Sequence, residues 1–194
     1  MKITRLIGIA ALAATLLSVS HADEKKHHDK AARKAVKIGK KASKKLLKTL
    51  GGNLKKHMKA GGPADALAFC AANAADLTAK VDHEMGKKVS VKRITLKPRN
   101  PANEAQGDER KILESLETLN RAGVKLPGHL LQKTATGYKY YKPLLINKKV
   151  CLKCHGGNIA PKLKAAIDKH YPTDKAHGYK MGDLRGAIVV DIQK

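Results

Sequence analysis

Apolar residues recur at intervals of three and four through residues 25–59, which is the spacing of one face of an amphipathic helix. The residues of this apolar face are Ala35, Ile38, Ala42, Leu46, Leu50, Leu54 and Met58. Lysines fill the opposite face at positions 37, 40, 41, 44, 45, 48, 55 and 56. The pair Gly51 and Gly52 is expected to kink this helix or divide it, because glycine weakens a helix interior. The pattern predicts a basic helical extension over residues 23–60.

Beyond residue 60, helical and strand patterns follow one another without a βαβ repeat. A break at Gly61-Gly62-Pro63 precedes the predicted helices, which cover residues 64–80, 109–122 and 160–169. β-Branched and aromatic runs predict strands over residues 89–96, 138–146 and 186–192, with a hairpin turn over residues 134–137. Arg93 interrupts the apolar alternation of the first strand. The elements together predict an α+β domain over residues 61–194, in which helices pack against an antiparallel sheet.

Cys151, Cys154 and His155 form the string C-x-x-C-H, the attachment signature of c-type haem. Two thiols separated by two residues on a tight turn can reach both vinyl groups of one porphyrin, and the histidine is then placed to bind the iron. A zinc site would need a second pair of ligands, and the one other cysteine is Cys70. A thioredoxin-like pair would need a βαβ unit. The motif therefore predicts one covalently bound haem c.

Haem c is attached outside the cytoplasm, so this interpretation requires an export signal. Lys2 and Arg5 form a basic start, residues 7–19 are apolar, and Ser20-His21-Ala22 resembles a cleavage site. The apolar run is too short for a comfortable membrane span, which needs about 20 residues. We expect a signal peptide over residues 1–22, cleavage after Ala22 and a periplasmic location.

The composition is strongly basic, with 40 Lys and Arg against 16 Asp and Glu and a formal net charge of +24. Three interpretations of the lysine-rich helix are open: a helix packed on the domain with a solvated basic face, attraction to an anionic membrane surface, or docking to an acidic redox or signalling protein. Nucleic acid is not an expected partner of an exported protein.

The second axial ligand of the iron is open at this stage. Its candidates are Cys70, Met58, Met85, Met181, His57, His83, His129, His170 and His177. Cys70 differs from the others because an unpaired cysteine in an exported chain requires an explanation. A small buried apolar residue is the alternative for Cys70. Arg99 and Arg185 are expected to pair with the haem propionates, with structural salt bridges as their alternative.

Four blocks of the chain, taken in order, resemble a family of exported or sensor-borne monohaem proteins with a PAS-like haem domain. The blocks are ALAFC (residues 66–70), RITLKPRNPAN (93–103), YYKPL running into CLKCHG (140–156), and YPTD continuing through GY to GDLRGA (171–187). The resemblance implies a PAS-like antiparallel sheet flanked by helices, one covalent haem, and axial ligation of the iron by His155 and Cys70.

A histidine and a thiolate together leave the iron no open position, and the thiolate stabilises ferric iron. Such a centre suits one-electron transfer or redox sensing. Reduction weakens the bond between the iron and Cys70, so that Cys70 could leave and a small ligand could be sensed in its place. A diffusible one-electron carrier that docks to acidic partners through its basic surface is the alternative. An enzyme such as a haem peroxidase is not expected, because the sixth position is filled.

Overall fold

The computed structural model describes the backbone of residues 10–194 and the side chains of residues 30–194. The signal peptide predicted over residues 1–22 falls outside the described side chains, and residues 1–9 fall outside the description altogether, so it stays a prediction. Among the described residues, no helix is both long enough and apolar enough to cross a membrane.

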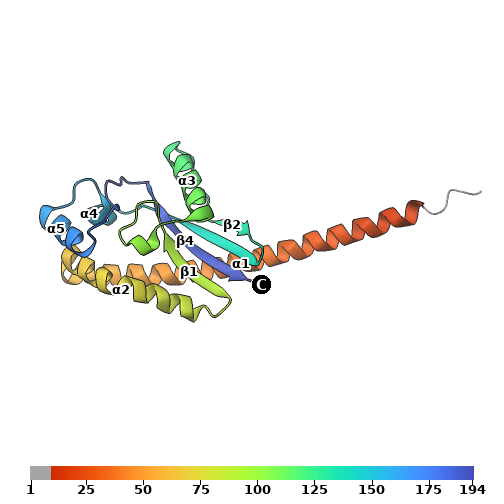
Figure 1. Ribbon diagram of the computed structural model, residues 1–194, viewed down its shortest axis with the longest axis horizontal. Helices are drawn as coiled ribbons and strands as arrows, with labels where there is room; N and C mark the ends of the chain where they lie inside the picture. The colour runs from red at the N-terminus through yellow and green to blue at the C-terminus, as the bar shows by residue number, and fades with distance from the viewer. Residues whose placement is uncertain (1–9) are drawn as a thin grey trace, which may run out of the picture.

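The first helix, α1 (Ala10–Ala60), is a single continuous element that extends well past the sheet at its N-terminal end (Figure 1). The predicted division at Gly51 and Gly52 is therefore wrong. Both glycines are exposed, and no other residue crowds them. The preceding turns are held by Leu46, which is fully buried, and by Leu50, which packs on the same apolar cluster. Tertiary packing thus maintains the helix where propensity alone would end it.

A tight turn reverses the chain between α1 and α2 (Gly62–Glu84), so that the two helices lie side by side (Figure 1). Gly62 begins α2 with a φ of 73°, a left-handed conformation that favours glycine, and Pro63 occupies the first turn. The helical hairpin brings α2, which carries Cys70, into contact with α1, β1 and α5.

Four antiparallel strands form one sheet in the order β1-β4-β3-β2. They are β1 (Val89–Ile94), β2 (Leu130–Lys133), β3 (Gly137–Leu145) and β4 (Leu184–Gln193). The predicted hairpin turn joins β2 to β3, with the Thr134 amide donating to the Gly137 carbonyl at 3.0 Å. The α+β class and the antiparallel sheet flanked by helices are confirmed.

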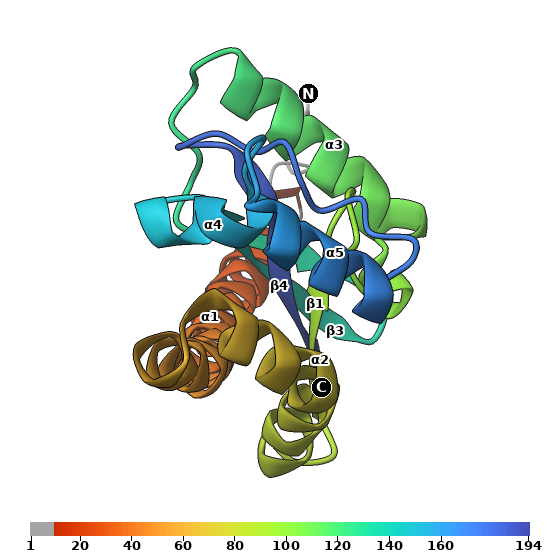
Figure 2. The ribbon, with the colours of Figure 1, turned by 90° about the vertical axis from the view of Figure 1, so that its left-hand side faces the viewer.

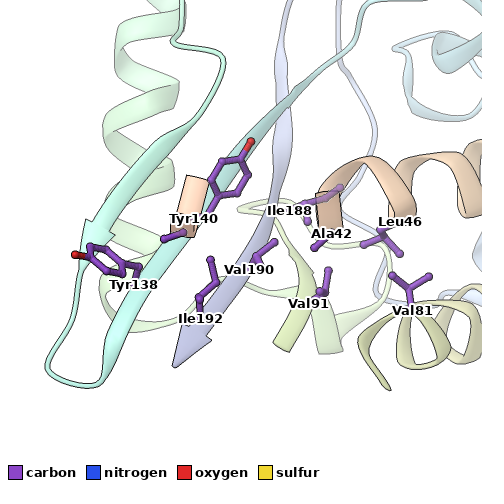
Figure 3. Packing of buried hydrophobic residues seen from close by; sticks show 10 residues of the cluster. Ala42, Leu46, Val81, Val91, Tyr138, Tyr140, Ile188, Val190 and Ile192 are labelled. Carbon is purple, nitrogen blue, oxygen red and sulfur yellow. The ribbon is translucent and has the colours of Figure 1, made fainter. Parts of the chain in front are cut away.

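Each face of the sheet is covered by a different set of helices. Helices α1 and α2 cover one face, with Ala42, Leu46 and Val81 packed against Val91, Tyr140 and Val190 (Figure 3). Helix α3 (Gly107–Arg121) covers the other face through Leu113 and Leu116, which contact Ile94, Tyr141 and Val189. The strands alternate between the two clusters, as a sheet buried on both faces requires.

The connection from β3 to β4 carries the short turn η2 (Lys149–Cys151) and the helices α4 (Leu152–His155) and α5 (Pro161–His170). Figure 2 shows α4 and α5 at one end of the molecule, between α3 on one side and the α1–α2 pair on the other. Helix α5 packs on α2 through Leu67, Leu163 and Ile167. The C-x-x-C-H motif therefore lies at the end of the sheet closest to the first turns of α2.

Gly39 permits the closest approach of α1 to the sheet. A Cβ atom at this position would collide with the ring of Tyr140, which is fully buried. For Gly39→Ala, overpacking costs about 1–3 kcal/mol, whereas the gain in helix propensity is at most about 1 kcal/mol. We expect a net destabilisation, measured as a lower midpoint of urea denaturation.

Gly51→Ala in the same helix provides the control, because nothing lies within 4 Å of the added methyl group. This substitution is expected to stabilise the protein by up to about 1 kcal/mol. Stabilisation by both substitutions would contradict the packing assigned to Gly39.

Candidate functional site

The C-x-x-C-H motif forms one helical turn. Cys151 has helical backbone angles (φ −64°, ψ −33°) and leads into α4, so Cys151 and Cys154 lie three residues apart on the same side of the turn. Gly156 ends the turn with its amide donating to the Leu152 carbonyl at 2.9 Å. A Cβ atom at Gly156 would lie 2.6 Å from that carbonyl oxygen, which explains the need for glycine directly after the motif.

His155 is held in one orientation by a backbone carbonyl. Its Nδ1 lies 2.7 Å from the carbonyl oxygen of Ala176. A carbonyl can only accept, so Nδ1 carries the proton and Nε2 keeps a free lone pair, as a metal-binding imidazole needs. Burial lowers the pKa of His155 to about 3, and the charges of Arg185 and Arg99 add to this effect. The imidazole is therefore neutral at physiological pH.

The loop that presents Ala176 is fixed by a buried ion pair. Arg99 donates from Nε and Nη2 to the two carboxylate oxygens of Asp174, at 3.2 and 3.1 Å, and from Nη2 to the Cys154 carbonyl at 2.6 Å. Asp174 also accepts the Ala176 amide at 2.8 Å. Although burial alone would raise it, the pKa of Asp174 is lowered by the hydrogen bonds from Arg99 and Ala176. One arginine thus ties the motif to the carbonyl that orients His155.

Cys70, far from the motif in sequence, lies beside it in the structure. Burial raises the pKa of the Cys70 thiol, the charge of Arg93 lowers it, and the charge of Cys154 raises it further, so the two thiols are close enough to interact. Burial also raises the pKa of the Cys154 thiol. Cys154 contacts the apolar cluster that joins α2 and α5. None of the three cysteines forms a disulfide.

These donors fit a covalently bound haem. Two thiols lie on one side of a helical turn, and the neutral imidazole that follows has a free Nε2. A third thiol, that of Cys70, lies on α2 one helical turn after Leu67, which belongs to the apolar cluster that Cys154 contacts. Cys154 contacts an apolar cluster, as the faces of a porphyrin require.

A family model described as Tll0287-like matches residues 12–193. The chain belongs to the Tll0287-like family. The crystal structure of the cyanobacterial heme-protein Tll0287 matches with a TM-score of 0.58 and 22% sequence identity, over 83% of this chain and 93% of that chain. At this identity the likeness shows a shared fold. No curated protein matches the chain.

In this Tll0287-like chain, the two arginines expected to pair with haem propionates have protein partners. Arg99 is engaged by Asp174 and two backbone carbonyls, which is the structural salt bridge considered as its alternative. Arg185 donates from Nη1 to the Thr95 hydroxyl at 2.6 Å and to the Lys97 carbonyl at 3.1 Å. Its guanidinium also lies 5.5 Å from the centre of the Tyr179 ring. Their pairing with propionates stays a prediction.

Three of the other candidates for the second axial ligand have contacts away from the motif. His57 bonds Asp65 at 2.8 Å and stacks on Phe69, His129 stacks on Tyr140, and Met85 packs against the cluster beneath α1. The pKa of the Cys70 thiol, by contrast, is raised by the charge of Cys154 in the motif, after the larger effects of burial and of Arg93.

Sequence reasoning missed Asp174, Ala176 and Arg93. Asp174 lies in the YPTD block that carries the family resemblance, but its partner Arg99 is distant in sequence. Ala176 acts through its backbone oxygen, for which a side-chain pattern gives no signal. Arg93 did leave a signal, because it breaks the apolar alternation of β1.

Proposed function

We propose that this chain is a periplasmic monohaem c-type protein that senses redox state or a small ligand through a haem with His155 and Cys70 as axial ligands. The observation that carries the proposal is the 2.7 Å contact between His155 Nδ1 and the Ala176 carbonyl, which leaves Nε2 unprotonated directly after two thiols on one turn. Membership of the Tll0287-like family and the likeness to a protein described as a heme-protein support haem binding.

Each residue of the proposed site has a separate task. Cys151 and Cys154 would hold haem covalently, His155 and Cys70 would bind the iron, and Leu67 with the α5 side chains would exclude water from one side. When bound, haem supplies one-electron chemistry and an iron whose axial positions decide whether a small molecule can bind. The buried Arg99–Asp174 pair would hold the loop that carries Ala176 against the motif, and so would fix the orientation of His155.

The identity of the sixth ligand is tested by Cys70→Ala. We expect the ferric absorption spectrum of the haem-loaded protein to lose its thiolate features, and the reduction potential to rise, because a thiolate stabilises ferric iron. Met181→Leu serves as the control, since Met181 is a sulfur-bearing candidate with 47% exposure and should leave the spectrum unchanged. A ferric spectrum that is identical in wild type and Cys70→Ala would rule out thiolate ligation.

A one-electron carrier is the second candidate function, and the surface of α1 favours it. No Asp or Glu occurs between residues 30 and 60. The basic residues on the exposed face are Lys30, Arg33, Lys34, Lys37, Lys40, Lys41, Lys44, Lys48, Lys55, Lys56 and Lys59. Such a surface would steer an acidic redox or signalling protein toward the domain, and an anionic membrane surface is the other partner of matching charge.

Carbon monoxide separates the two functions. If the protein is a sensor, we expect the chemically reduced protein to bind CO, because weakening of the bond to Cys70 on reduction opens one position. Cys70→Ala should bind CO faster than wild type and provides the positive control. Absence of CO binding by reduced wild type, with salt-sensitive electron exchange with an acidic redox protein, would favour the carrier instead.

A further inference from the structure

Arg93 occupies a position where the sheet otherwise places apolar side chains. In β1, Val89 and Val91 face the cluster beneath α1 and α2, whereas Lys92 on the other face pairs with Glu109 of α3 at 2.9 Å. Side chains alternate between the faces of a strand, so Arg93 points to the α2 side with the two valines. A guanidinium at this inward position requires a compensating partner.

The described residues give the Arg93 guanidinium only one hydrogen bond, and that bond is long. Arg93 Nη2 donates to the Ala74 carbonyl at a long 3.4 Å. Its Nε is buried and has no hydrogen-bond partner, and no other buried side-chain nitrogen or oxygen of the described residues is left in this state. Burial lowers the pKa of Arg93, and only Cys70 and Tyr171 act against that effect. A buried donor without a partner points to an anionic group that the site holds when it is complete.

The position of the guanidinium identifies this group. Ala74, which Arg93 contacts, lies one helical turn after Cys70 on α2, so both residues lie on the same face of that helix. Of the charged groups that influence the Cys70 thiol, Arg93 is the strongest. Arg99 and Arg185 are already engaged by Asp174, Thr95 and backbone carbonyls.

We propose that Arg93 is a positioning residue of the haem site, whose guanidinium balances the negative charge of the Cys70 sulfur when that sulfur is an axial ligand. This inference rests on the proposed His155 and Cys70 pair. A positive charge or hydrogen bond beside a ligating sulfur draws electron density from it and favours the reduced iron. Arg93 would therefore raise the reduction potential of a centre that thiolate ligation alone would hold low.

The experiment compares Arg93→Met with Lys92→Met in the full haem-loaded protein, each in wild-type and Cys70→Ala backgrounds. Both substitutions remove one positive charge from β1, but Lys92 lies on the opposite face of the sheet. We expect Arg93→Met to shift the midpoint potential to more negative values by clearly more than Lys92→Met. In the Cys70→Ala background this excess shift should become much smaller, because the sulfur on which Arg93 acts is absent.

Two outcomes would overturn the inference. A shift of equal size with and without Cys70 would mean that Arg93 acts on another group, such as a haem propionate. A shift no larger than that of Lys92→Met would mean that it does not tune the centre. If Arg93→Met fails to accumulate, Arg93→Gln removes the charge and keeps a polar side chain. It should lower the midpoint potential only when Cys70 is present, and an unchanged potential would contradict the proposal.

The outcome also separates this inference from the proposed function. If Cys70→Ala itself leaves the ferric spectrum unchanged, the proposed axial pair fails. If that spectrum changes but the Arg93 and Lys92 variants have equal potentials, only the assignment of Arg93 fails.

Discussion

Replacing Cys151 and Cys154 together with alanine is expected to abolish covalent haem attachment. The two thiols lie on one helical turn, and the third, that of Cys70, lies on α2 outside the turn, so no other thiol can replace them. Haem staining of the protein after denaturing electrophoresis should fall to background. The intact mass should decrease by one haem beyond the change due to the two substitutions.

Cys70→Ala is the matched control for covalent attachment. It removes a cysteine from the same site but not from the turn, so the denatured protein should still stain for haem while its native ferric spectrum changes. The two variants thus separate attachment from axial ligation. Retention of haem stain by the Cys151/Cys154 variant, or its loss in Cys70→Ala, would show that the thiols have been assigned the wrong tasks.

The sequence could predict the elements whose signals are local. The three-and-four spacing before residue 60 predicts a helix, because one face of that helix is buried. The β-branched run over residues 186–192 predicts β4, because both faces of that strand are buried. The sequence does not predict strand β2, because its four residues LLQK are too few to show alternation. The continuity of α1 past Gly51 depends on packing against residues far along the chain.

The candidate site likewise combines residues with a local sequence signal and residues whose role depends on the fold. Cys151, Cys154 and His155 are neighbours in sequence, so their chemistry could be recognised without a fold. Arg99 and Arg185 are predicted from the sequence as propionate partners, which stays untested. The charges of both lower the pKa of His155, but their partners Asp174 and Thr95 come from other segments. Arg93 was first only an irregularity in a strand, and its meaning required the position of α2.

Asp174→Asn is expected to destabilise the domain strongly. The Asp174 side chain is 2% exposed and that of Arg99 is 13% exposed, so the substitution leaves a buried guanidinium without its counter-charge. Removing one partner of a buried pair typically costs about 3–5 kcal/mol, which is a large part of the roughly 5–15 kcal/mol by which a domain is stable. Urea denaturation at neutral pH should show this loss.

An exposed ion pair provides the control. Lys164 and Asp168 on α5 are closer together, at 2.6 Å, but both side chains are more than 40% exposed. Asp168→Asn should therefore cost only about 0.3–0.5 kcal/mol, because solvent screens the pair. Equal losses in the two variants would contradict the view that burial rather than distance gives the Arg99–Asp174 pair its importance.

The pH dependence of stability gives a second test of the same pair. The pKa of Asp174 is lowered in the folded protein relative to an unfolded aspartate, which titrates near about 4. A lowered folded-state pKa contributes stability that is fully present above the unfolded pKa and is lost as pH falls through the folded one. The difference between wild type and Asp174→Asn should therefore be constant from about pH 7 to 5 and shrink below about pH 4. A difference that is independent of pH down to the acid transition would mean that the charge of Asp174 is not what stabilises the loop that carries Ala176.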